Sequence, residues 1–226
     1  MVALLVVSSQ KAKELIAKGV AKRVRDSKKR VYFAYGSTNQ LILSQLGIEV
    51  ENYYNGYIAN GELRSNKTKP NIVILNGEGS DFVETISADD IVIKGANALS
   101  FENGEYRAGV AVASPQGGTY GNVLLKASCI GAEVIIPVSH EKLVPKLLSN
   151  RYTQSSFDIS MGLPVALLPL TYGDIYTEIE AFKELFNLKA EIYLAGGVDD
   201  MVGSLTFVVE GKQSDILDAK REIDDR

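Results

Sequence analysis

Short apolar runs that alternate with segments of helical periodicity constrain this fold most. The apolar run Val2–Val7 predicts a strand, and a helical pattern follows from Gln10 to Arg25, with Ser8 and Ser9 placed to cap that helix. Such alternation favours a doubly wound, mainly parallel α/β sheet of the Rossmann-like type. The further predicted strands are Val31–Ala34, Asn71–Asn76, Asp90–Lys94, Ala108–Ala113 and Glu133–Val138, and the further helices are Thr38–Leu46, Phe82–Ile86 and Tyr120–Gly131.

The pattern changes after about Ser149. The stretch Asn150–Ser156 is polar and aperiodic, which is typical of a linker. Beyond it the expected order is strand, helix, strand, strand, helix, a smaller ferredoxin-like α+β unit that lacks its last strand. We therefore predict two domains, residues 1–149 and residues 150–226. The elements expected in the second are Pro164–Leu170, Asp174–Phe186, Ala190–Ala195, Ser204–Glu210 and Gln213–Ile223.

Composition excludes several classes of protein. Cys129 is the only cysteine and His140 the only histidine, so an intrachain disulfide and a cysteine-based zinc site are impossible, and we expect neither a metal nor a cofactor. The net charge of −4 argues against a nucleic-acid partner. No apolar run reaches the roughly 18 residues of a membrane helix. No Lys or Arg precedes Val2–Val7, so we expect a buried strand rather than a signal peptide, and a cytoplasmic protein.

The first candidate for a ligand site is the turn Gly36-Ser-Thr38. It follows a predicted strand and opens a predicted helix, where free backbone N–H groups and the positive end of the helix dipole attract anions. The hydroxyl groups of Ser37 and Thr38 add hydrogen-bond donors. The alternative is a helix N-terminus that binds nothing.

Two further segments carry candidate residues. Gly117, Gly118 and Thr119 lie between the strand Ala108–Ala113 and a helix, where adjacent glycines allow close approach to a ligand, although the same residues suit a plain turn. Lys94 ends an apolar strand. There its ammonium would bind an anion, act as an amine of lowered pKa, or pair with a nearby carboxylate such as Asp89, Asp90 or Glu102.

His140 follows the strand Glu133–Val138. This position suits a catalytic residue, although a lone histidine also serves as a capping or surface residue. We name Lys94 and His140 as the candidate catalytic residues.

Two of these segments resemble a known family. The first match is to the N-terminal region of ribose-5-phosphate isomerase. It rests on the segments Ala17-Lys-Gly-Val-Ala-Lys22, Gly36-Ser-Thr38 and Leu46-Gly47. That superfamily also includes CoA transferases and the sugar-phosphate-sensing domains of bacterial repressors. The second match is Lys94-Gly-Ala-Asn97, where the isomerases carry Asp-Gly-Ala-Asp with catalytic carboxylates. The chain also resembles a prokaryotic family of unknown function that shares the Lys-Gly-Ala-Asn-Ala and Gly-Gly-Thr segments.

The resemblance implies a Rossmann-like fold and a phosphorylated or CoA-like ligand. Because Lys94 and Asn97 replace the two carboxylates, it does not imply isomerase activity. We expect a binding protein for a small anionic metabolite (a phosphorylated sugar, a nucleotide or a CoA-like molecule) that assembles as a homo-oligomer. The alternative is an isomerase or transferase in which Lys94 is catalytic. The ligand-binding residues are expected to be Gly36, Ser37, Thr38, Gly95, Asn97, Gly117, Gly118 and Thr119, converging at one edge of a parallel sheet.

Overall fold

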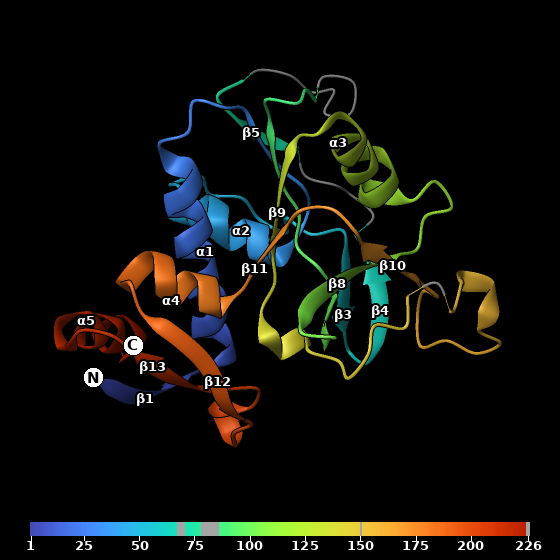
Figure 1. Ribbon diagram of the computed structural model, residues 1–226. Helices are drawn as coiled ribbons and strands as arrows, with labels where there is room; N and C mark the ends of the chain where they lie inside the picture. Colours follow the sequence, from blue (N-terminus) through green and yellow to red (C-terminus); the bar gives the residue numbers. More distant parts are fainter. Residues whose placement is uncertain (67–70, 78–85, 150, 225–226) are drawn as a thin grey trace.

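A five-stranded mixed sheet lies at the centre of the computed structural model, which describes residues 1–66, 71–77, 86–149 and 151–224 (Figure 1). Its strand order is β11-β9-β6-β2-β5; the first four are parallel, and β5 runs antiparallel to β2. The short central strands are apolar and mostly buried, as expected of parallel strands covered on both faces. The bounds are β2 Val31–Phe33, β5 Val73–Leu75, β6 Ile91–Ile93, β9 Glu133–Pro137 and β11 Asp174–Tyr176.

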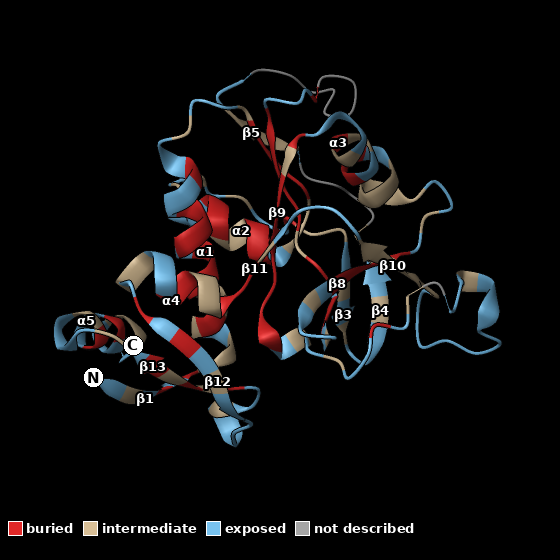
Figure 2. Cartoon of the chain, viewed as in Figure 1, coloured by how far each residue is buried: buried red, intermediate tan, exposed pale blue. Residues whose placement is uncertain are grey.

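Helices cover the sheet on both faces. Side chains alternate between the faces along each strand, so Phe33 and Ile93 pack with α1, whereas Tyr32 and Val92 pack toward α3. Figure 2 shows that buried residues concentrate on β9 and on the inward side of α1. The α-helices in the described part of the chain are α1 Ser9–Arg25, α2 Ser37–Gln45, α3 Leu125–Ile130, α4 Glu178–Phe186 and α5 Gln213–Asp224; a π-helical turn, Tyr120–Leu124, precedes α3.

The expectation of a doubly wound, mainly parallel Rossmann-like sheet is wrong. The protein is mixed α/β, and apart from the central sheet the described strands form small antiparallel sheets. Two Asn-Gly turns explain much of the difference. Asn60-Gly61 joins β3 to β4 and Asn103-Gly104 joins β7 to β8, and all four residues have positive φ, the geometry of a tight hairpin. The bounds are β3 Gly56–Ala59, β4 Glu62–Ser65, β7 Ala98–Glu102 and β8 Glu105–Val112.

The expectation of a ferredoxin-like unit in the second half of the chain is also wrong. β10 (Ala166–Leu170) pairs antiparallel with β8 and with none of the described strands that follow it in the sequence. β12 (Lys189–Ala195) pairs with β13 (Leu205–Glu210), and β1 (Val2–Val7) from the opposite end of the chain pairs with the other edge of β13. The division at residues 149 and 150 stays a prediction, although three sheets combine strands from both sides of it.

Most of the predicted ranges are confirmed within a few residues. The exceptions are informative. The range Asp174–Phe186 begins as β11 and becomes α4 only at Glu178, and the hairpin β3–β4 was not expected at all. The predicted Phe82–Ile86 helix lies, apart from Ile86, outside the described residues.

Candidate functional site

The four parallel strands end at one edge of the central sheet. α2 begins beyond β2, Lys94 follows β6, Ser139 and His140 follow β9, and Thr177 and the start of α4 follow β11. In α/β sheets this carboxyl edge is where ligands commonly bind.

The turn at residues 36–38 is held by Tyr53. The Gly36 N–H donates to the main-chain oxygen of Tyr53 at 2.7 Å, and the Tyr53 hydroxyl donates to that of Phe33 at 2.6 Å. Gly36 precedes the first turn of α2, and no side chain caps the helix. Ser37 is exposed and Thr38 is buried. The predicted donors therefore stand at a helix N-terminus, with one N–H group already used by Tyr53.

Asn39 ties this turn to the end of β6. Its Nδ2 donates to the main-chain oxygens of Ala34 at 2.6 Å and Ile93 at 2.8 Å. Its Oδ1 is buried and has no hydrogen-bond partner among the described residues. Since Ile93 immediately precedes Lys94, the first turn and the Lys94 strand end are neighbours, as expected.

Lys94 and Lys142 form a pair of ammonium groups, the first buried and the second half-buried. Lys94 is 8% exposed and its Nζ donates to the main-chain oxygen of Gly95 at 3.0 Å; Lys142 Nζ donates to that of Ala96 at 2.8 Å. Burial, and then the positive charge of Lys142, lower the pKa of Lys94 to about 8. Burial also lowers the pKa of Lys142, an effect that Glu141 opposes and Lys13 reinforces.

Glu141 is occupied by partners on α1. It forms an ion pair with Lys13 at 3.0 Å and accepts a hydrogen bond from the Ser9 hydroxyl. Within the described ranges, no carboxylate forms an ion pair with either Lys94 or Lys142. The expected alternative, a salt bridge from Lys94 to Asp89, Asp90 or Glu102, is therefore absent there.

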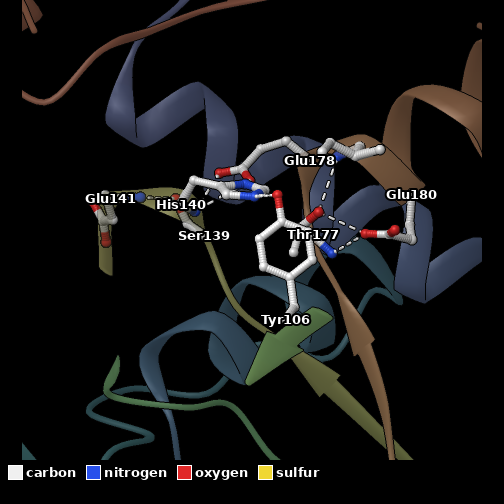
Figure 3. Close-up of polar contacts among 8 residues, drawn as sticks. Tyr106, Ser139, His140, Glu141, Thr177, Glu178 and Glu180 are labelled. Carbon is white, nitrogen blue, oxygen red and sulfur yellow. Dashed lines mark hydrogen bonds and ion pairs between the residues drawn. The ribbon is translucent and has the colours of Figure 1, made fainter. Parts of the chain in front are cut away.

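His140 lies in a buried chain of hydrogen bonds (Figure 3). Its Nδ1 is 2.6 Å from Glu178 Oε2, its Nε2 is 2.8 Å from the Tyr106 hydroxyl, and its main-chain N–H also reaches the Glu178 carboxylate. The side chains of His140 and Glu178 are 1% and 0% exposed. Burial, followed by the charges of Glu180 and Glu178, raises the pKa of Tyr106.

A groove of about 450 Å³ lies beside Tyr106. It runs along the edge strand β11 and α4, and the Tyr176 hydroxyl donates within it to Glu184 at 2.9 Å. The residues that line it are Arg23, Tyr106, Gly173, Asp174, Ile175, Tyr176, Glu180 and Glu184.

The second glycine loop does not end a strand of the central sheet. Gly117 and Gly118 have positive φ, but they follow β8, which belongs to an antiparallel sheet. Asn97 is exposed, and its Oδ1 accepts the Ala111 N–H at 3.0 Å, so its side chain braces β8. The premise that parallel strands bring all three segments to one edge is wrong, because only two of them end parallel strands. Ligand binding by Asn97, Gly117, Gly118 and Thr119 stays a prediction.

Two residues of the buried chain were not singled out from the sequence. Tyr106 lies outside the predicted strands and helices, and Glu178 lies inside the predicted helix Asp174–Phe186. One signal was available for Glu178: Thr177 and Glu180 form a capping box, which marks a helix that starts at residue 178.

Comparisons with family models, curated proteins and solved structures find no match. The resemblance to ribose-5-phosphate isomerase therefore stays a hypothesis. In the described residues, none of the helices combines the length and the apolar character needed to cross a membrane. Among the same residues, no group of three or more His, Cys, Asp or Glu side chains is arranged to hold a metal ion.

Proposed function

We propose that the protein binds a small anionic metabolite at the carboxyl edge of the central sheet, with Lys94 and Lys142 supplying the positive charge. The observation that carries this proposal is that buried Lys94 and half-buried Lys142 bind main-chain oxygens and no carboxylate in the described residues. Burying a charge without an opposite charge is costly, and two like charges make it more so. An anion between the two groups would offset that cost.

The first turn adds directional donors to this charge. The N–H groups of Ser37 and Thr38 belong to the start of α2, and Asn39 fixes that start against β6. Helix N-termini bind phosphate and carboxylate groups through such N–H groups. A phosphorylated sugar, a nucleotide or a CoA-like molecule would suit these donors.

Ribose-5-phosphate isomerisation is not part of the proposal. Moving a proton between neighbouring carbons needs a positioned base. The residues at the matching positions are Lys94 and Asn97, and the Asn97 amide oxygen is engaged by Ala111.

The alternative is an isomerase or transferase in which Lys94 is catalytic. The lowered pKa of Lys94, about 8, favours it, since about one amine in ten would be neutral at pH 7 and able to act as a nucleophile or base. Borohydride reduction in the presence of a carbonyl substrate would trap a covalent adduct on Lys94 in that case, and none in a binding protein.

Thermal denaturation with a ligand panel tests the proposal. The panel is inorganic phosphate, ribose 5-phosphate, AMP and CoA, each added to the wild type, Lys94→Met and Lys28→Met. A ligand at 100 times its Kd should add about 2.7 kcal/mol to the stability of the wild type. Lys94→Met should weaken binding roughly 10- to 100-fold, the value of a charge-assisted hydrogen bond. Lys28 is exposed and lies at the opposite edge of the sheet, so Lys28→Met should leave ligand binding unchanged. A panel without any stabilising ligand contradicts the proposal.

We also propose that the protein is cytoplasmic and that it forms a homo-oligomer. The outward side chains of Val2, Leu4 and Val6 on β1 are more than half exposed, which supports self-association through this sheet. Light scattering that finds a monomer at all concentrations would contradict the oligomer.

A further inference from the structure

We infer that Tyr106 is a nucleophile activated by His140 and Glu178, and that the groove beside it accepts an acyl ester. This activity is separate from the proposed anion site, because it uses other atoms and another surface. It stands on the hydrogen-bond chain, on the burial of the two inner residues and on the groove that Tyr106 lines.

The hydrogen bonds fix the roles of the two imidazole nitrogens. Glu178 is the first residue of α4, where the helix dipole favours a negative charge, and its carboxylate also accepts the His140 main-chain N–H. The carboxylate can only accept, so His140 Nδ1 carries the proton that lies 2.6 Å from Glu178 Oε2. In the neutral ring Nε2 then holds a lone pair and accepts the Tyr106 O–H at 2.8 Å.

This arrangement is that of a nucleophile, a base and a group that orients the base. Both distances fall within the hydrogen-bond reach of about 2.6–3.2 Å that such a set needs. The imidazole is held rigidly, since its side chain is 1% exposed and the Tyr106 ring packs edge-on against it with centroids 5.1 Å apart. The buried contact between His140 and Glu178 adds little to stability, because the cost of desolvating the two groups offsets most of their attraction. A functional role therefore explains the contact better than stability does.

Tyr106 needs this base. Its raised pKa keeps the phenol protonated near neutral pH, so the hydroxyl gains nucleophilic character only by giving its proton to His140. The situation is that of a serine beside a histidine in hydrolases, where the proton moves during attack.

The groove favours an acyl group over a phosphoryl group. It is lined by the carboxylates of Asp174, Glu180 and Glu184 and by a single guanidinium, Arg23, which is already paired with Asp174 at 3.3 Å. A phosphate dianion would meet net negative charge there, whereas a neutral ester would not.

The reaction balances with these groups alone. The phenol oxygen attacks the acyl carbon and forms an O–C bond, while the phenol proton passes to His140 Nε2. The bond to the leaving alkoxide or phenoxide breaks, and the leaving group takes the proton from His140. The product is an ester on Tyr106, which water hydrolyses with His140 again acting as base.

Acetylation by p-nitrophenyl acetate tests the inference. The protein is treated near neutral pH, and the rate of acetyl transfer to each tyrosine is followed by peptide mass spectrometry. Tyr193, which is 63% exposed and has no imidazole contact among the described residues, is the internal reference. We expect Tyr106 to react at least tenfold faster than Tyr193 in the same sample. Equal or slower reaction of Tyr106 overturns the inference without the need for any variant.

Variants then separate catalysis from structure. His140→Gln should slow acetylation of Tyr106 by about 100-fold or more, the usual contribution of a general base, with Tyr193 unchanged. An unchanged Tyr106 rate overturns the inference.

Glu178 is a positioning residue, and its role is tested by a spectroscopic measurement. Since His140 is the only histidine, the ¹⁵N spectrum of labelled protein reports one ring. It should show protonated Nδ1 in the wild type and lose that preference in Glu178→Gln; the opposite tautomer in the wild type overturns the inference.

Discussion

The ammonium groups of Lys94 and Lys142 bind the main-chain oxygens of two consecutive residues, Gly95 and Ala96. One lysine comes from the end of β6 and the other from the turn after β9, so neighbouring parallel strands bring the two charges together. Main-chain oxygens solvate an ammonium without neutralising it. The site therefore keeps a net positive charge beside the start of α2.

The stability of the protein should depend on pH through Lys94. Its pKa is about 8 when folded and 10.5 when unfolded, so the unfolded chain binds more protons between these values and stability rises with pH across that window. Below pH 8 the folded protein keeps Lys94 charged in its buried position, which lowers the stability by roughly 3 kcal/mol for this shift in pKa. Lys94→Met should thus be more stable than the wild type at pH 7, with the gain shrinking by pH 9.5. Urea denaturation between pH 6.5 and 9.5 measures this, and parallel curves for the two proteins would refute it.

Asn39→Ala should lower the free energy of unfolding by about 1–3 kcal/mol, because the main-chain oxygens of Ala34 and Ile93 each lose a hydrogen bond, although that of Ile93 keeps the Ala34 N–H. The exposed Gln45 on the same helix offers a control, and Gln45→Ala should stay within about 0.5 kcal/mol of the wild type. Chemical denaturation of both variants makes the comparison. Equal effects of the two substitutions would mean that Asn39 does not tie α2 to the sheet.

Gly19→Ala should destabilise the protein although alanine favours helices. An added Cβ would overlap the hydroxyl oxygen of Tyr176, whose side chain is almost fully buried and hydrogen-bonded to Glu184. We expect a loss of about 1–3 kcal/mol, typical of overpacking. Combining Gly19→Ala with Tyr176→Phe removes the nearest atom and should recover part of the loss. Strictly additive effects in the double-mutant cycle would show that the two residues are not in contact.

The sequence predicted the local elements better than the way they combine. Apolar runs such as Val31–Phe33 and Ile91–Ile93 identified the central strands, because strands buried on both faces are continuously apolar. The Asn-Gly pairs at residues 60–61 and 103–104 are strong hairpin signals and would have exposed the antiparallel sheets. The pairing of β1 with β13 left no local trace, since it joins segments about two hundred residues apart.

For the candidate site, too, the sequence identified single residues but not the contacts between them. Lys94, Gly36 and His140 were identifiable because each follows a recognisable strand. The partnership of His140 with Tyr106 and Glu178 was not, since the three residues are separated by 34 and 38 positions and meet only through the packing of β8 and α4. The partial burial of Lys142 beside Lys94, and hence the pairing of two like charges, is likewise a property of the tertiary structure.

Calorimetric titration with sulfate at pH 8.5, in two buffers of different ionisation heat, tests the anion site through its protons. Sulfate carries no titratable proton at this pH, so any proton uptake belongs to the protein. An anion beside Lys94 should raise the pKa of Lys94 from about 8 toward its ordinary value, and binding should draw in up to about one proton per sulfate. Lys94→Met should show no such uptake, while Lys28→Met should match the wild type. Absence of binding, binding without proton uptake, or the same uptake in Lys94→Met would contradict an anion site built on Lys94.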